Sequence, residues 1–251
     1  MGRFSIMIIA LFSVITVNAL ANILPLNNQT TGEISNRLPV LFTPAGYVFS
    51  IWSVIYVLLI VWLVGMWKKS KQGDANYTKR STIFIISCVL NIAWIYLWHY
   101  EKFLFTVIVM IGLLITLVLL YKTYPVSDNS IKSRLPISVY LGWISVATIA
   151  NISYVLTYYE WNGWGLSDPL WAVIMMTIGT ALALHIRFHH FDIAYVFVFI
   201  WAFIGIAVRN GLEELLVTTA ALFLSAVMLA GIIFMKKSMR NSSSSPKRVI
   251  D

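Results

Sequence analysis

The sequence predicts an all-α membrane protein that crosses the bilayer about eight times. Three observations support this prediction. The mean hydropathy of the 251 residues is +0.82, and 59% of them are apolar, compared with about 45–50% in soluble domains. Only 11% are charged, about half the usual share. The apolar runs between the charges are close to the ~20 residues of a transmembrane helix, so no large water-soluble domain fits.

Eight apolar stretches are the expected membrane spans. They are residues 4–24, 41–67, 82–100, 103–121, 137–158, 170–184, 193–208 and 215–235. The sixth and seventh stretches are shorter than a typical span, so we expect wider helix boundaries or tilted neighbours there. The four consecutive serines and Pro246 near the C-terminus predict a disordered cytoplasmic tail at 239–251.

The distribution of basic residues predicts the orientation. If the N-terminus is cytoplasmic, the eight spans place 15 of the 18 Lys and Arg residues on the cytoplasmic side of the membrane. Only Arg37, Lys102 and Arg209 then lie on the opposite side. Short loops rich in Lys and Arg stay in the cytoplasm. We therefore expect a multi-pass protein with both termini cytoplasmic.

The first stretch has a second interpretation. A short basic start, an apolar run and the sequence Ala19-Leu20-Ala21 also fit a secretory signal with a cleavage site. Cleavage would leave seven spans and an outside N-terminus without changing the orientation of the rest.

Aromatic residues and asparagines recur at helical spacing in three stretches. Residues three, four or seven apart share one face of an α-helix, so each group forms a stripe. The stripes are Phe49, Trp52 and Tyr56 in the second stretch; Asn91, Trp94 and Trp98 in the third; and Tyr140, Trp143, Ala147 and Asn151 in the fifth.

The depth of these residues suggests a shared pocket. Asn91 is near the middle of its stretch, which at 1.5 Å per residue places it roughly 15 Å into the membrane, and Trp52 is similarly deep. Aromatic walls with a few polar groups suit a flat, mostly apolar ligand. The alternative is that the aromatics anchor helices at the interfaces and the asparagines bond neighbouring helices.

The three striped segments resemble motifs of the TspO proteins, also called tryptophan-rich sensory or translocator proteins. Residues 140–151 are similar to the family signature Y-L-x-W-x-x-x-A-x-x-x-N, and residues 90–98 to L-N-x-x-W-S-x-x-F. Pro44 with Phe49, Trp52 and Tyr56 is similar to P-P-x-x-x-F-x-x-V-W-x-x-L-Y. The resemblance covers residues 1 to about 158.

This resemblance implies a five-helix bundle, often homodimeric, that binds porphyrins, haem-like tetrapyrroles and, in some members, sterols or synthetic aromatic ligands. The pocket would be closed by the loop between the first two helices. Together, the stripes and the resemblance predict nine ligand-binding residues: Trp52, Tyr56, Asn91, Trp94, Trp98, Tyr140, Trp143, Ala147 and Asn151.

The chain departs from the family pattern at several points. Ala45 replaces the second proline, the interval from Phe49 to Trp52 is one residue shorter, and residues 25–39 contain no tryptophan. Three further spans follow the five-helix part. We therefore expect a TspO-like membrane domain at 1–160 and a three-helix membrane extension at 161–238.

A histidine cluster in the extension is the other candidate site. His185, His189 and His190 have the spacing of one histidine box of membrane di-iron oxygenases, but only His99 lies elsewhere. We interpret the cluster as a cytoplasmic helix end, where Arg187 and the histidines favour the helix dipole and anionic lipid headgroups. We expect no metal site and no catalytic residue.

The sequence therefore predicts a plasma-membrane protein that binds a porphyrin, haem or similar molecule for sensing, sequestration or transport. A transporter or permease-like subunit without tetrapyrrole binding is the alternative. No cofactor is required, and porphyrin degradation is suggested by the resemblance alone. The expected partners are the small molecule, membrane lipid and a second copy of the chain. Nucleic acid is not expected, because the basic residues follow the topology.

Overall fold

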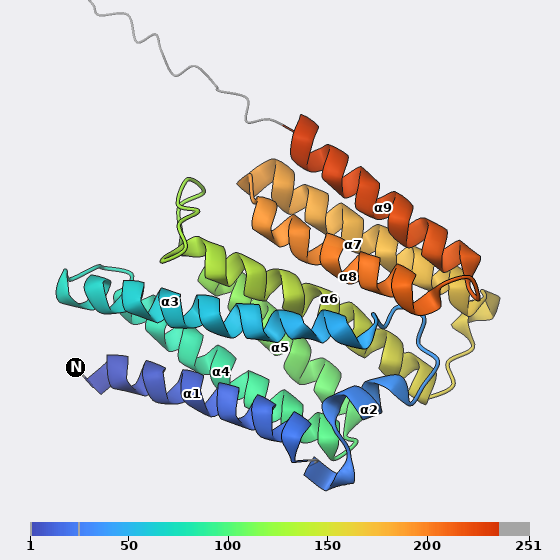
Figure 1. Ribbon diagram of the computed structural model, residues 1–251. Helices are drawn as coiled ribbons and strands as arrows, with labels where there is room; N and C mark the ends of the chain where they lie inside the picture. Colours follow the sequence, from blue (N-terminus) through green and yellow to red (C-terminus); the bar gives the residue numbers. More distant parts are fainter. Residues whose placement is uncertain (1, 25, 236–251) are drawn as a thin grey trace, which may run out of the picture.

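The computed structural model describes residues 2–24 and 26–235, which form an all-helical bundle without a strand (Figure 1). The predicted tail at 239–251 lies outside the described residues. The elements in chain order are α1 (Gly2–Ile23), η1 (Leu26–Asn28), α2 (Thr31–Asn36), η2 (Gly46–Ser50), α3 (Ile51–Lys71), α4 (Tyr77–His99), α5 (Phe103–Tyr121), α6 (Arg134–Tyr158), η3 (Gly163–Gly165), α7 (Asp168–His190), α8 (Ile193–Asn210) and α9 (Leu215–Phe234).

Within the described part of the chain, eight helices are long and apolar enough to cross a membrane. They coincide with the eight predicted stretches, and η2 and α3 run on as one span, Gly46–Lys71. The sixth stretch has the wider boundaries expected for it, because α7 has 23 residues. Its last turn contains Arg187, His189 and His190, which lower the local hydropathy but not the helix propensity of the segment.

The start of the second stretch is the main difference from the expected boundaries. Residues 41–45 form no helix. The N–H of Ala45 donates to the carbonyl oxygen of Gly205 in α8, at 3.0 Å, and Pro44 has no N–H to donate. The apolar character of this segment therefore reflects packing against α8 rather than a helix.

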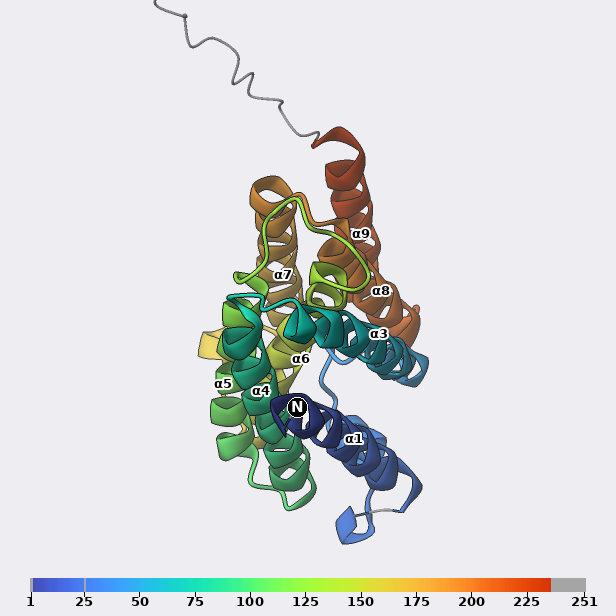
Figure 2. The ribbon, with the colours of Figure 1, turned by 90° about the vertical axis from the view of Figure 1, so that its left-hand side faces the viewer.

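Helix α6 is the centre of the bundle. In its most apolar window 72% of the residues are buried, compared with 28% for α1, α7 and α9. Viewed nearly along the helices, α6 lies between α1, α3, α4 and α5 on one side and α7, α8 and α9 on the other (Figure 2). It packs against α3, α5, α7 and α8, so it joins the two predicted membrane parts. The division expected at residue 160 falls in the connection between α6 and α7.

A buried polar cluster joins α5 and α6 to the connection between α7 and α8. Arg134 and Asp192 are both at most 2% exposed, with 3.9 Å between the Arg134 Nε and the Asp192 carboxylate. The Asp192 carboxylate also accepts hydrogen bonds from Tyr121 (2.8 Å) and Ser138, while Arg134 donates to the carbonyl oxygen of His190 (3.0 Å). Buried charges are tolerated when they are paired in this way, and this network ties α5 and α6 to the turn between α7 and α8.

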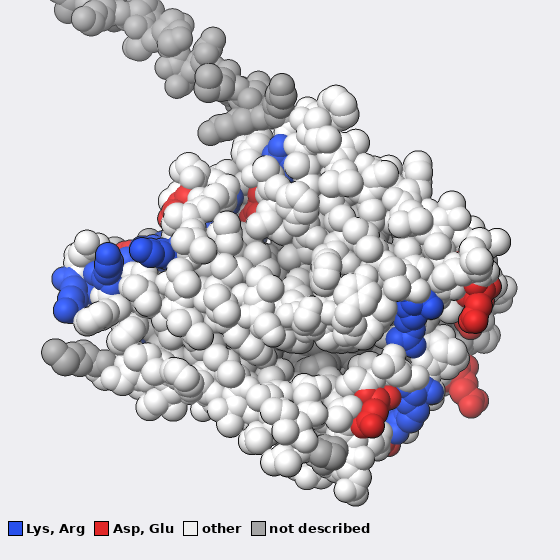
Figure 3. All heavy atoms as spheres, in the orientation of Figure 1, with Lys and Arg blue, Asp and Glu red and all other residues white. Residues whose placement is uncertain are grey.

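Charged side chains lie at the two ends of the bundle, and the band between them is uncharged on the face shown in Figure 3. This is the distribution that a bilayer requires. The same view shows a recess in the uncharged band, between α1 and α3.

Candidate ligand-binding site

A cavity of about 460 Å³ lies among the first five spans of the bundle. Its volume is within the range of small-molecule sites, about 300–1,000 Å³. Residues of α1, α2, η2, α3, α4, α5 and α6 line it: Ile15, Asn18, Ala19, Asn22, Thr31, Gly32, Ser35, Asn36, Gly46, Phe49, Trp52, Ser53, Tyr56, Asn91, Trp94, Ile95, Met110, Leu113, Trp143, Ile144 and Ala147. None of these side chains is charged, so the cavity favours a ligand whose buried part is neutral.

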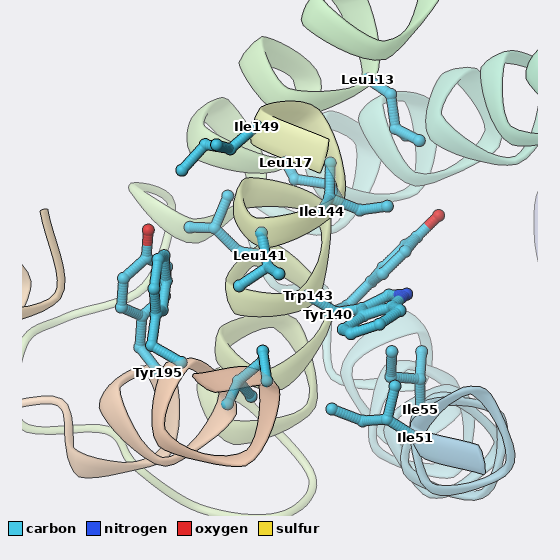
Figure 4. Close-up of a cluster of buried hydrophobic side chains, with 14 of the residues drawn as sticks. Ile51, Ile55, Leu113, Leu117, Tyr140, Leu141, Trp143, Ile144, Ile149 and Tyr195 are labelled. Carbon is cyan, nitrogen blue, oxygen red and sulfur yellow. The ribbon is translucent and has the colours of Figure 1, made fainter. Parts of the chain in front are cut away.

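Aromatic rings from α3 and α6 form one wall of this cavity. The Trp52 ring stacks on Tyr56, with 5.6 Å between the centroids, and meets Trp143 edge-on at 6.3 Å. Phe49 packs edge-on against Trp143 at 5.8 Å. Trp143 projects from α6 toward α3, where Ile51 and Ile55 lie, whereas the Tyr140 hydroxyl points away from them (Figure 4). Such edge-on and stacked contacts fix the rings in place, so the wall is preformed.

A chain of buried hydrogen bonds begins at two asparagine side chains in the cavity lining. The side chain of Asn18 in α1 donates to the Asn91 Oδ1 at 2.9 Å, and the Asn91 amide donates to the Tyr140 hydroxyl at 3.2 Å. All three residues are at least nine-tenths buried. Buried polar groups at this depth require partners, and here three different helices provide them.

A second, smaller cavity of about 60 Å³ adjoins the first and shares five lining residues with it: Ser35, Phe49, Trp94, Trp143 and Ala147. Trp98 and Asn151 line this smaller space. The Asn151 side chain is already occupied, because it accepts from the Trp94 indole N–H at 3.3 Å and donates to the Thr106 hydroxyl at 2.9 Å. Asn151 therefore positions Trp94 rather than contacting the main cavity.

The nine predicted residues thus divide into three groups. Trp52, Tyr56, Asn91, Trp94, Trp143 and Ala147 line the main cavity. Trp98 and Asn151 line only the smaller one. Tyr140 lines neither; it lies behind the wall, 6.0 Å from the Trp52 ring.

One end of the main cavity is covered by residues 26–37. We call this segment the outer cover, because the distribution of basic residues predicts that this end faces away from the cytoplasm. The Arg37 guanidinium pairs with Glu101 at 2.6 Å, and this hydrogen bond lowers the pKa of the Glu101 carboxyl. His99 is fully buried; its ring nitrogens lie 3.1 Å from the Leu26 carbonyl oxygen and 2.9 Å from the Thr31 hydroxyl. The cover is therefore attached to the end of α4 by an ion pair and by a buried imidazole.

The cover also contains a short, well-capped helix. Thr30 caps α2, and the Glu33 carboxylate accepts from the Thr30 N–H at 2.6 Å, an arrangement that stabilises a helix start. The same hydrogen bond lowers the pKa of Glu33. Polar residues of this region, Thr31, Ser35 and Asn36, face the cavity together with Asn22, so its outer end is polar and its inner end aromatic.

Several of these residues were not among the predicted site residues. Asn18 is a buried amide in a strongly apolar helix, and that burial in a membrane span is a signal of a polar contact. His99 was noted only as the histidine outside the cluster. The resemblance predicts that the loop between the first two helices closes the pocket. The sequence does not identify which residues of this loop face the cavity, because that depends on how the loop folds back over the bundle.

The histidine cluster lies at the end of α7, as interpreted from the sequence. His185 and His189 stack with 4.4 Å between ring centroids. Arg187 donates to the Ile232 carbonyl oxygen near the end of α9, at 3.0 Å. In residues 2–24 and 26–235 no group of three or more His, Cys, Asp or Glu side chains has a geometry that would hold a metal ion.

Comparisons with known proteins place the chain in a family. No curated protein and no solved structure matches the chain significantly. The family of TSPO-like proteins matches over residues 4–234. This match continues beyond residue 158 and includes the last three spans as well as the cavity. The chain therefore belongs to the TSPO-like protein family.

Proposed function

We propose that this membrane protein binds a flat, mostly apolar aromatic molecule in the main cavity, with a porphyrin or haem as the ligand class to test first. The observation that carries the proposal is the combination of a preformed aromatic wall with two hydrogen-bonded asparagines in the lining of one cavity of about 460 Å³. Stacking on indole rings and hydrogen bonds from amides are the interactions that such a ligand uses.

Two further features support this proposal. The Tyr56 hydroxyl and the Trp143 indole nitrogen belong to lining residues, are buried and have no hydrogen-bond partner among the described residues. A bound ligand or water would satisfy them. The polar outer end of the cavity would receive the polar edge of the ligand. Arg37 of the outer cover directly follows the lining residue Asn36 in the chain. The macrocycle would lie against Trp52.

The test is a titration of the detergent-purified protein with protoporphyrin IX and haem, followed by tryptophan quenching and the Soret band. Trp52→Leu removes one aromatic wall and should weaken binding about tenfold or more, roughly 1.4 kcal/mol. Trp67→Leu is the matched control, because Trp67 is on the same helix but half exposed and outside the cavity. Equal affinities in the two variants would contradict the proposal, as would the absence of saturable binding.

We further propose that the protein resides in the plasma membrane with both termini cytoplasmic and uses binding to sense, sequester or move its ligand. Flux of the porphyrin across reconstituted vesicles would distinguish transport from retention. A transporter without tetrapyrrole binding would show neither quenching nor porphyrin flux.

A further inference from the structure

A third cavity, of about 260 Å³, lies at the outer end of the bundle and shares no residue with the ligand cavity. It is formed by the segment 39–42, the end of α6, the connection to α7 and the first turns of α7. Its chemistry differs from that of the main cavity, because two carboxylates, Glu160 and Asp168, line it and no basic side chain does.

Glu160 has an unfavourable backbone conformation, and its negative charge lies at an unfavourable end of a helix. It follows α6 with a φ of +52°, and the N–H of Trp161 donates to the Leu156 carbonyl oxygen at 3.0 Å. This is the helix-ending position that glycine usually occupies. A carboxylate at a helix C-terminus is also repelled by the helix dipole. Among the described residues, its side chain has neither an ion pair nor a hydrogen bond.

The Glu160 side chain is exposed, so water compensates its charge and the carboxylate is available to pair with a ligand. The strained positive φ at a residue that lines the cavity is the feature that points to a function of the side chain. Glu101 at the end of α4 provides the comparison: it also has a positive φ, +56°, but its carboxylate pairs with Arg37. Asp168, in the first turn of α7, is at a position that the helix dipole favours, but it too lacks an ion pair among the described residues.

Indole rings complete the site. Trp161 and Trp171 line the cavity with 5.0 Å between their centroids. Trp164 packs on both, at 5.3 and 5.8 Å. The Trp171 N–H donates to the Gly163 carbonyl oxygen at 2.7 Å, which fixes the orientation of that ring. Indole faces next to carboxylates are the environment that binds substituted ammonium ions.

We propose that this outer cavity binds an alkyl-substituted ammonium group, with Glu160 and Asp168 neutralising its charge and Trp161 and Trp171 contacting its methyl groups. Apolar side chains such as Leu41 and Met175 line the same cavity and would receive the carbon chain of the ligand. The ammonium group belongs either to a free organic cation or to a lipid headgroup, and both present the same chemistry to these residues.

The probe is choline, titrated into the full-length protein in an uncharged detergent and followed by tryptophan fluorescence and equilibrium dialysis. Its neutral isostere, 3,3-dimethylbutan-1-ol, has the same shape without the charge. We expect saturable choline binding and at least tenfold weaker binding of the isostere. Equal binding of both probes, or the absence of saturable binding of choline and of the lipid probe below, would overturn the proposal.

Water-soluble dibutanoyl phosphatidylcholine distinguishes the two sources of the ammonium group. Binding at least tenfold tighter than that of choline would identify a lipid headgroup site, provided that dibutanoyl phosphatidylglycerol does not compete. Tighter binding of choline would identify a site for free cations. Competition by phosphatidylglycerol with equal strength would show that the phosphate or acyl chains are recognised, and it would contradict the proposal.

Variants test the assigned residues. Glu160→Gln and Asp168→Asn should each weaken choline binding at least tenfold, whereas Glu213→Gln, an exposed acid outside the cavity, should have no effect. Glu160→Gly should lose binding and yet raise the melting temperature, because glycine accepts the positive φ. Unchanged binding in Glu160→Gln would refute the assignment. Trp52→Leu should retain choline binding, so the outcome is independent of the porphyrin proposal.

Discussion

Asn91 links the polar groups of the main cavity at the scale of single residues. Its amide accepts from Asn18 and donates to Tyr140, so one side chain joins α1, α4 and α6. The stripe on α4 identified Asn91 in the sequence. Its partners were not predictable from the sequence, because periodicity shows which face of a helix a residue occupies but not which helix lies opposite.

Replacing Asn91 with Leu should destabilise the protein by about 1 kcal/mol and weaken porphyrin binding. The Tyr140 hydroxyl would lose its donor, and Asn18 would retain only its bond to the Val14 carbonyl oxygen. Thermal unfolding in detergent and the porphyrin titration measure the two effects. Ser87→Ala is the control, because Ser87 is buried one turn away but bonds only within its own helix, to the Phe84 carbonyl oxygen. A similar loss of porphyrin affinity in both variants would contradict this role of Asn91.

The ion pair of the outer cover should make its opening depend on pH. The pKa of Glu101 is lowered in the closed cover from its ordinary value of 4.5. A carboxyl with a lowered pKa stabilises the closed state above its ordinary pKa, and this contribution is lost as the pH falls through the lowered value. Glu33, whose pKa is also lowered, acts in the same direction.

Hydrogen exchange of amides 26–37, corrected for intrinsic exchange, should therefore show weaker protection as the pH falls below about 4.5. In the Glu101→Gln variant, amides 26–37 should be less protected than in the wild type already at pH 7, and their protection should change less on acidification. Protonation of Glu33 would cause the change that remains. Identical protection of the wild type and Glu101→Gln at pH 7 would show that the ion pair does not hold the cover.

At the scale of elements, α8 holds the segment that leads from the cover into α3. The Trp201 indole N–H donates to the Val48 carbonyl oxygen at 3.1 Å, and the Asn210 amide donates to that of Leu41 at 3.0 Å. Gly205 lies so close to η2 that an added Cβ would be 2.1 Å from Val48 Cγ2. Helix α8, beyond the part that the motifs cover, therefore positions Phe49 and the aromatic wall.

Gly205→Ala should destabilise the fold by about 1–3 kcal/mol, because the new methyl group overlaps Val48 and must displace η2. Porphyrin affinity should fall with it, since η2 carries Phe49. The matched control is Gly112→Ala in α5, where the nearest side-chain atom would lie at an ordinary 3.8 Å and where alanine should stabilise the helix by about 0.5–1 kcal/mol. Thermal unfolding measures both changes in stability. A Gly205→Ala protein as stable as the wild type would show that η2 moves aside without a loss of stability.

The elements also show how far the sequence predicts this fold. Hydropathy identified all eight spans because burial in lipid and burial in protein select the same residue types. It placed residues 41–45 in a helix because an apolar turn packed on α8 has the same composition as a helix end. Six of the nine predicted site residues line the main cavity, but the motifs could not show that Tyr140 lies behind Trp52.

At the scale of the whole molecule, the distribution of charge predicts how the bundle lies in the membrane. The last turn of α3 contains Lys68, Lys69 and Lys71, whereas the connection between α6 and α7 contains Glu160 and no base. The cytoplasmic side is the basic one, so the outer cover and the third cavity should face outward.

Cysteine labelling tests this orientation. In a Cys88→Ser background, Asn162→Cys should react with a membrane-impermeant maleimide in intact cells. Gln72→Cys should react only after permeabilisation. Both residues are exposed, and the native Cys88 is buried. The reverse pattern would invert the proposed topology and place the ammonium site in the cytoplasm.

Residues 35–46 border each of the three cavities described above. Ser35, Asn36 and Gly46 line the largest, Thr43 and Pro44 the smallest, and residues 39–42 the outer one. A ligand in one cavity that displaces residues 35–46 therefore changes the volume of the neighbouring cavities. The free energy of such a coupling is reciprocal, so a cation outside would alter porphyrin affinity by the same factor by which porphyrin alters the affinity for the cation. The occupancy of a cavity within the bilayer would then be detectable at the outer surface.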